Sequence, residues 1–195
     1  MNDKKAEILI REAGAADAGL ISVLGGVTFY EAYFEQDAPP DLANYILDAF
    51  EINKIRAEIE NPQATFFILY LDGKAVGYAK LREDSEVYCI ENETAVELQR
   101  IYLVERVFGK GLGKLLLNHC LEYAGQKGFS TLWLGVWEEN IRARKFYEKY
   151  GFRRVGTITF PYGDTVGTNF VMEKVLSKNQ PGDQRRPSSN DNNSD

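Results

Sequence analysis

A glycine-rich segment in the middle of the chain has the composition of an anion-binding turn. The run Gly109-Lys110-Gly111-Leu112-Gly113-Lys114 follows a short apolar stretch and opens a segment whose apolar residues recur at helical spacing. Glycines leave backbone N–H groups uncovered by side chains, and at the start of a helix these groups lie at the positive end of the helix dipole. The two lysines add positive charge. The segment therefore predicts a site for a phosphate or diphosphate group.

The spacing of these glycines does not match two well-known phosphate motifs. A P-loop needs Ser or Thr after the lysine, whereas Leu115 follows Lys114 here. A dinucleotide fingerprint needs Gly-x-Gly-x-x-Gly near the first strand, whereas these glycines alternate and lie in the middle of the chain. Because glycine-rich segments also form turns that bind nothing, a turn without a ligand is the alternative at this point.

Composition and charge exclude several other classes of protein. The chain has 195 residues, 44% of them hydrophobic, and its formal net charge of -6 argues against a general nucleic-acid binder. Cys89 and Cys120 are too few for a disulfide framework, and His119 is the only histidine, so we expect no metal site. The N-terminus lacks the apolar core of a signal peptide, and no run is long enough for a membrane helix. We therefore expect a soluble, cytoplasmic protein with no membrane partner.

The hydrophobic pattern predicts alternating strands and helices that would position the glycine segment. Strands are predicted over residues 7–13, 65–71, 75–81, 97–104, 131–137, 152–160 and 169–175, and helices over 17–33, 41–50, 54–60, 111–126 and 140–150. Asp72-Gly73 predicts a hairpin turn because both residues tolerate a positive φ, and residues 83–94 are predicted as a loop. Two strand–helix units beside antiparallel hairpins indicate an α/β (α+β) fold, with a mixed, mostly antiparallel central sheet of about six or seven strands flanked by helices.

The end of the chain differs sharply in composition. Residues 177–195 contain no aromatic or large aliphatic side chain and cannot bury apolar surface. We therefore predict a single domain over residues 1–176 followed by a polar, disordered tail over 177–195.

A second block, residues 131–156, adds the specificity that the glycines lack. A strand ends at Trp137, and Asn140, a favourable N-cap residue, opens a helix that carries Phe146-Tyr147. Together with Glu97, Gly111-Leu112-Gly113, Ala143 and Gly151-Phe152, this block resembles the acetyl-CoA-dependent N-acetyltransferase superfamily known as GNAT. The resemblance extends over about residues 6–176 and is strongest from Glu97 to Phe152. It implies a GNAT-like domain and an enzyme that uses acetyl-CoA as co-substrate.

One position departs from the superfamily pattern. The superfamily usually carries Gln or Arg three residues before the first glycine of its phosphate turn. With Gly111 as that glycine, the position is occupied by Phe108. With Gly109 it would be Arg106, but the helix would then start one turn too early for its apolar face. We therefore prefer the Gly111 alignment, in which the backbone site is kept and one side-chain contribution is lost.

The resemblance implies which residues contact the cofactor. The diphosphate of CoA would bind the backbone between strand and helix, the pantetheine arm would run along the end of the strand before it, and the asparagine amide would contact the cofactor. Carried over, these residues are Ile101, Tyr102, Leu103, Gly109, Lys110, Gly111, Leu112, Gly113, Lys114 and Asn140.

The expected reaction is direct attack of a primary amine on the acetyl thioester. An aliphatic amine has a reference pKa of about 10.4, so a proton must leave before it can attack. By resemblance Glu97 is the candidate base, acting directly or through water; the alternative is an ion pair with Arg100 or Lys80. Other members place the base five residues before the asparagine, a position that holds Gly135 here. Tyr147 resembles the tyrosine that protonates the leaving thiolate, the alternative being a core tyrosine beside Phe146.

The acceptor amine is suggested by finer similarities. The phrases ELQRIYL, WLGVWEEN and FPYGDTVGTNFVM are most similar to the bacterial spermidine/spermine (polyamine) N-acetyltransferase group, which implies a small-molecule amine and is consistent with a homodimer. Candidate residues for a cationic substrate are Tyr30, Glu31, Tyr33, Glu35, Asp37, Trp137 and Asp164. Alternatives are acetylation of protein N-termini, lysines or antibiotic amines and, from another class, a non-catalytic acyl-CoA sensor.

Overall fold

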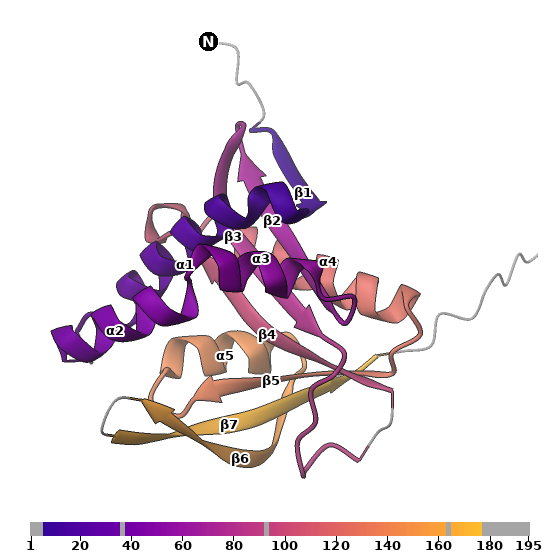
Figure 1. Cartoon of the computed structure of the whole chain (residues 1–195). Helices are drawn as coiled ribbons and strands as arrows, with labels where there is room; N and C mark the ends of the chain where they lie inside the picture. Colours follow the sequence, from indigo (N-terminus) through magenta and orange to yellow (C-terminus); the bar gives the residue numbers. More distant parts are fainter. Residues whose placement is uncertain (1–5, 36–37, 92–93, 163–164, 177–195) are drawn as a thin grey trace, which may run out of the picture.

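A seven-stranded sheet spans the described part of the chain, residues 6–35, 38–91, 94–162 and 165–176 of this computed structural model (Figure 1). The strand order is β1-β2-β3-β4-β5-β7-β6. The strands are β1 (Ile8–Glu12), β2 (Ala64–Leu71), β3 (Lys74–Arg82), β4 (Ala95–Leu103), β5 (Thr131–Trp137), β6 (Arg153–Tyr162) and β7 (Thr165–Val175). Only β4 and β5 pair in parallel among these strands; the other pairs are antiparallel. The predicted single α/β domain with a mixed, mostly antiparallel sheet is thereby confirmed.

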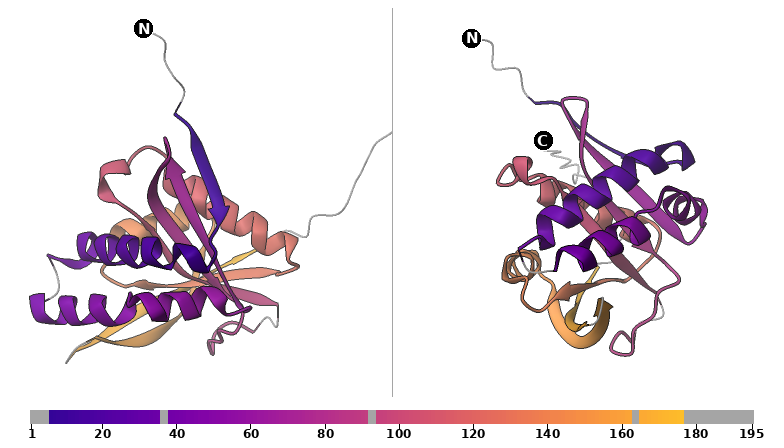
Figure 2. Two further views of the ribbon diagram at one scale, coloured as in Figure 1. Left: turned by 45° about the horizontal axis from the view of Figure 1, so that its top comes forward. Right: turned by 60° about the vertical axis from the view of Figure 1, so that its left-hand side comes forward.

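Helices cover both faces of this sheet (Figures 1 and 2). Figure 2 shows α1 (Ala18–Tyr33), α2 (Pro39–Ala49) and α3 (Ile52–Glu60) on one face, and α4 (Leu112–Gln126) and α5 (Ile141–Lys149) on the other. The short 3-10 helices η1 (Ala15–Asp17) and η2 (Glu105–Val107) precede α1 and α4. Helix α2 begins two residues earlier than predicted because Pro39 and Pro40 occupy its first turn, where a proline removes no needed hydrogen bond.

Burial on two faces explains the apolar central strands. Residues from Thr65 to Leu69 on β2 are all buried, because helices cover both sides of that strand. Ile21 and Ile55 fill the space under α1 and α3, while Leu116 and Cys120 fill the space under α4. The predicted hairpin between β2 and β3 is present, with Asp72 at φ 49° and Gly73 at φ 72°.

The parallel pair at the centre of the sheet is short and then opens. Strands β4 and β5 pair only from Ala95 opposite Thr131 to Glu97 opposite Trp133. A bulge follows in β4, since Leu98 lies opposite Leu81 but Arg100, not Gln99, lies opposite Lys80. Beyond this point β4 stays with β3 and β5 stays with β7. A gap therefore widens between two neighbouring strands in the middle of the sheet.

Two further points concern the end of the chain and the length of the helices. The tail predicted over residues 177–195 falls outside the described residues, so this tail and the domain boundary at residue 176 stay predictions. Among the described helices, none has the length and apolar character needed to cross a membrane.

Candidate active site

A cavity of about 1180 Å³ occupies the gap between the diverging strands. Residues 98–103 of β4 form one wall and Gly135–Trp137 of β5 the other. The C-terminal half of α1, the turn before α4, the start of α5 and the β6–β7 hairpin complete the lining. The glycine turn and the Asn140–Tyr147 helix, which lie in separate parts of the sequence, therefore meet at one site.

The glycine turn has the backbone geometry of an anion site. Gly109 (φ 78°) and Gly111 (φ 77°) are in the left-handed region, which favours glycine. Gly111 is the N-cap of α4, so the helix starts where the Gly111 alignment places it. The N–H groups of the first turn have no intrahelical acceptor by helix geometry. Gly109, Gly111, Leu112, Gly113 and Lys114 line the cavity, whereas Lys110 does not. A diphosphate fits this turn because it accepts the hydrogen bonds that these N–H groups offer.

The wall formed by β4 suits an extended ligand. Ile101, Tyr102 and Leu103 all line the cavity. Because β5 has diverged, this edge of β4 has no strand partner among the described residues beyond Glu97. Backbone N–H and C=O groups on an unpaired edge can bind a ligand as an added strand does. The amide-containing pantetheine arm of CoA has matching donors and acceptors.

Asn140 caps α5 and keeps one polar group for the cavity. Its Oδ1 accepts a hydrogen bond of 2.9 Å from the backbone N–H of Ala143. This bond satisfies an N–H group at the start of α5 and fixes the side chain. The Nδ2 group is then left as a donor on the cavity wall, where Asn140 lies.

Tyr147 lines the cavity although its side chain is largely buried. The residue is 8% exposed, and its ring contacts Phe146 and Phe152 at centroid distances of 5.4 and 5.6 Å. Burial, with a smaller contribution from Tyr102, raises the pKa of the Tyr147 phenol above its ordinary value. The hydroxyl group therefore stays protonated at neutral pH, as a proton donor must.

Glu97 lies outside the cavity lining. It is the last residue of β4 that pairs with β5, and its carboxyl group is buried and hydrogen-bonded to Ser85. Its Oε2 atom has no hydrogen-bond partner among the described residues. Burial raises the pKa of Glu97 against the opposing effects of Ser85 and nearby cations. The structure therefore does not bring this carboxylate beside Tyr147.

The suggested ion pair of Glu97 with Arg100 or Lys80 is not formed either. Both cations bind Glu58 on α3, with N–O distances of 2.8 Å from Arg100 and 2.9 Å from Lys80. Desolvation, reinforced by Arg100, lowers the pKa of Lys80 to about 8. Arg100 also lines the cavity, so a paired guanidinium group forms part of its wall.

The sequence analysis missed Gln99. This residue occupies the bulge in β4 and lines the cavity, and its Oε1 atom is buried without a hydrogen-bond partner among the described residues. The signal in the sequence is the adjacent pair Gln99-Arg100, two polar residues that interrupt a strand of regular alternation.

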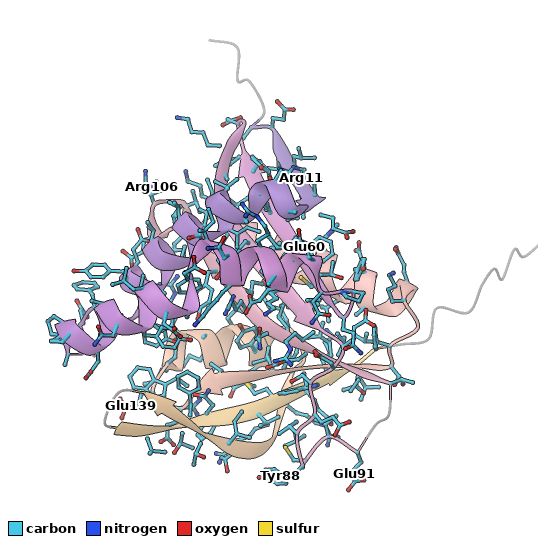
Figure 3. All side chains as sticks on the ribbon, viewed as in Figure 1. Arg11, Glu60, Tyr88, Glu91, Arg106 and Glu139 are labelled. Atoms are coloured by element: carbon cyan, nitrogen blue, oxygen red, sulfur yellow. The ribbon has the colours of Figure 1, made fainter. Side chains whose placement is uncertain are left out.

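Four of the seven candidate substrate residues line the cavity, and Glu31 reaches toward the glycine turn, because its Oε2 atom accepts a 2.9 Å hydrogen bond from the backbone N–H group of Glu105. Glu31, Tyr33, Glu35 and Trp137 line the cavity, and the rings of Tyr33 and Trp137 are 6.0 Å apart. Tyr30 does not; its exposed ring stacks on Phe34. Figure 3 shows Glu139, a lining residue, near the β6–β7 hairpin and Arg106 near the turn before α4. Asp37 and Asp164 fall outside the described residues.

These features together define a class of protein. A cavity in an opened parallel strand pair, with a glycine turn at the start of a helix and a protonated tyrosine on its wall, is the arrangement expected of an acetyl-CoA-dependent N-acetyltransferase. The chain belongs to the acetyltransferase (GNAT) family, whose sequence profile matches residues 27–152. It is therefore an N-acetyltransferase with acetyl-CoA as co-substrate.

Known proteins support this assignment. An uncharacterized N-acetyltransferase of Lactobacillus delbrueckii subsp. lactis is 34% identical over 149 residues, or 76% of this chain and 86% of that protein. The N-acetylaspartate synthetase of Xenopus tropicalis is 33% identical over 100 residues, 51% of this chain and 35% of that protein. The crystal structure of PaiA N-acetyltransferase from Thermoplasma acidophilum in complex with coenzyme A has a TM-score of 0.71 at 24% identity, covering 87% of this chain and 99% of that one. This last similarity concerns the fold.

Proposed function

We propose that the chain acetylates the primary amine of a small molecule, and that a polyamine such as spermidine or spermine is the first acceptor to test. The observation that carries the proposal is the continuous cavity from the glycine turn to the acidic and aromatic residues of α1, with Tyr147 on its wall. Acetyl-CoA supplies the acetyl thioester. The chain supplies binding, orientation and proton transfer.

Each residue at the site has a separate task in this proposal. The turn from Gly109 to Lys114 holds the diphosphate, and Asn140 with the free edge of β4 orients the pantetheine arm. Orientation of the two reactants supplies much of the rate. The Tyr147 hydroxyl group donates its proton to the leaving sulfur. Its raised pKa keeps this hydroxyl group protonated at neutral pH, so the proton is available to the sulfur as negative charge develops there.

Glu97 keeps a role as a proton acceptor only through a relay. Its carboxyl group is outside the cavity lining, so direct contact with the acceptor amine is not supported. Gln99 and Arg100, which follow it on β4, do line the cavity, and water between them would complete such a relay. With Glu97→Gln, loss of the acidic limb of the pH–rate profile would support the relay. An unchanged profile would assign Glu97 to structure.

The charge of the lining favours a cationic acceptor at one end. Glu31 on α1 and Glu35 in the turn after it provide carboxylates, and Tyr33 and Trp137 provide ring faces for an ammonium group. These residues support a polyamine, whose second amine would remain charged when the first is acetylated.

A second acceptor class is favoured by a specific observation. Arg100 on the cavity wall and Lys80 share the single carboxylate of Glu58, so one positive charge is left over at this part of the site, which would favour an acceptor carboxylate over an ammonium group. One relative over half of this chain is an N-acetylaspartate synthetase, whose name indicates an amine that carries carboxylates. An amino acid is therefore the second acceptor to test.

Release of free CoA thiol in the presence of a panel of amines would separate these proposals. The panel contains spermidine, spermine, aspartate, an aminoglycoside and a peptide with a free N-terminus. Higher kcat/KM for polyamines supports the first proposal, and higher values for aspartate support the second. Turnover of the peptide alone would overturn both. Glu35→Gln, at the acidic end, should raise KM for spermidine and leave KM for aspartate unchanged.

A further inference from the structure

A contact across the cavity explains the unusual residue before the glycine turn. Phe108, which precedes Gly109 directly, is an apolar residue where the superfamily pattern has Gln or Arg. In the structure the guanidinium carbon of Arg142 lies 3.8 Å from the centre of the Phe108 ring. Arg142 belongs to the first turn of α5, and both side chains line the cavity beside Gly109. A cation from another helix therefore lies next to the turn that lacks one.

The charge of Arg142 is not neutralised by a partner. Among the described residues Arg142 has no ion pair, although Glu105 and Glu139 also line the cavity. Arg144 on the same helix differs, because it donates a 2.7 Å hydrogen bond to the carbonyl oxygen of Glu138. Stacking on a ring uses the flat face of a guanidinium group and leaves its N–H edge free. Arg142 is thus exposed and in contact with Phe108, and no carboxylate in the described part of the chain pairs with it.

We propose that Arg142, held by its stacking on Phe108, binds a phosphate group of acetyl-CoA. A guanidinium group matches phosphate oxygens with paired N–H donors, which a backbone turn alone does not provide. CoA carries a diphosphate and a 3′-phosphate, and the guanidinium group of Arg142 would bind either of them by the same hydrogen bonds. The proposal rests on the use of acetyl-CoA and is independent of the acceptor amine.

The first test is a calorimetric measurement of CoA binding without any amine. We expect Arg142→Ala to weaken binding by about tenfold or more, as for loss of a charge-assisted hydrogen bond. Phe108→Ala should weaken it by about threefold, since it removes only the stacking. The double variant should bind no more weakly than Arg142→Ala. The control is Lys145→Ala, an exposed cation on the same helix that does not line the cavity, and its affinity should equal that of the unmodified chain.

Dephospho-CoA identifies the phosphate group. If the effect of Arg142→Ala disappears with this ligand, Arg142 binds the 3′-phosphate; if the effect persists, it binds the diphosphate. Phe108→Arg in the Arg142→Ala background should restore much of the affinity by placing the cation on the turn itself. Equal CoA affinity of Arg142→Ala and Lys145→Ala would overturn the proposal. Because no acceptor is present, failure of the acetyl-transfer assay would not affect this result.

Discussion

Burial sets the chemistry of single side chains around the cavity. Desolvation raises the pKa of both Tyr147 and Glu97, with opposite consequences for their use. A raised pKa keeps a phenol protonated at neutral pH but makes it a weaker acid. The same effect makes a carboxyl group easier to protonate, so Glu97 loses part of its charge at a higher pH than an exposed glutamate does. A carboxylate with a raised pKa is also a stronger base, so its position outside the cavity lining, and not its pKa, separates Glu97 from Tyr147.

Removal of the Tyr147 hydroxyl group should reduce turnover without weakening cofactor binding. We expect Tyr147→Phe to lower kcat by about 10² to 10⁴-fold, the usual contribution of general acid catalysis. CoA affinity should stay within about twofold, because the ring and its packing are retained. Steady-state kinetics and calorimetry would measure the two effects. Tyr150→Phe, which removes the hydroxyl group of the cavity-lining residue that directly follows α5, is the matched control and should keep kcat. An unchanged kcat in Tyr147→Phe would contradict the acid role.

Glu97→Gln should change stability in a pH-dependent way. Because the pKa of Glu97 is raised in the folded chain, the unfolded chain loses this proton first as the pH rises. The stability that the protonated group contributes is present below its unfolded pKa and is lost as the pH rises through the folded value. Glutamine does not titrate, so the variant should gain stability relative to the unmodified chain between pH 4 and pH 7. Urea unfolding at both pH values would measure this, and a constant difference would show that burial of Glu97 carries no such cost.

At the level of elements, the start of α4 requires a glycine at position 111 because of the backbone conformation there and not because of crowding. A methyl group at Gly111 would meet no atom within 4 Å, so crowding does not explain the glycine. Its positive φ does, because an L side chain in this region costs about 1–2 kcal/mol. Any other residue at position 111 would therefore adopt an unfavourable backbone conformation, even though its side chain would have room.

Gly111→Ala should destabilise the chain and weaken CoA binding together. We expect a loss of about 1–2 kcal/mol in the free energy of unfolding, measured with urea. Gly125→Ala is the matched control, since Gly125 lies inside α4 with open space and no positive φ. Alanine there should add about 0.5–1 kcal/mol through its higher helix propensity and leave CoA affinity unchanged. Equal effects of the two changes would show that the conformation at Gly111 is not the reason for its glycine.

Local patterns predicted most of these elements, and long-range contacts account for what they missed. The turn at Asp72-Gly73 and the helix over residues 111–126 can be predicted because they depend on residues that are close in sequence. The bulge at Gln99 is not, because it arises where the register with β3 shifts between Lys80 and Leu81. Resemblance to the superfamily predicted Glu97 at the site, on a regular strand over residues 97–104. The bulge in β4 instead brings Gln99 and Arg100 to the cavity. The contact of Arg142 with Phe108 likewise joins two segments that only the folded sheet brings together.

At the level of the whole molecule, the open strand pair is a gap that a ligand can fill. The central sheet has lost the pairing of β4 with β5 beyond Glu97 and Trp133, and a cavity of about 1180 Å³ takes its place. The chain has a net charge of -6, and Lys114 and Arg142 are two cations of the cavity lining near the glycine turn, where Glu105 also lies. We therefore expect a cofactor bound in this gap to connect the two halves of the sheet.

CoA should accordingly stabilise the whole domain against heat. A ligand present at 100 times its Kd adds about 2.7 kcal/mol when it binds only the folded state. For a domain of this size that corresponds to a rise in Tm of about 5–10 °C. Differential scanning calorimetry with and without CoA would measure the shift, with pantetheine at the same concentration as the control that lacks phosphate groups and should act weakly. Because binding neutralises charge at Lys114 and Arg142, the shift should shrink as salt is added. A Tm that CoA leaves unchanged at this concentration would mean that the cofactor does not bridge the open strands.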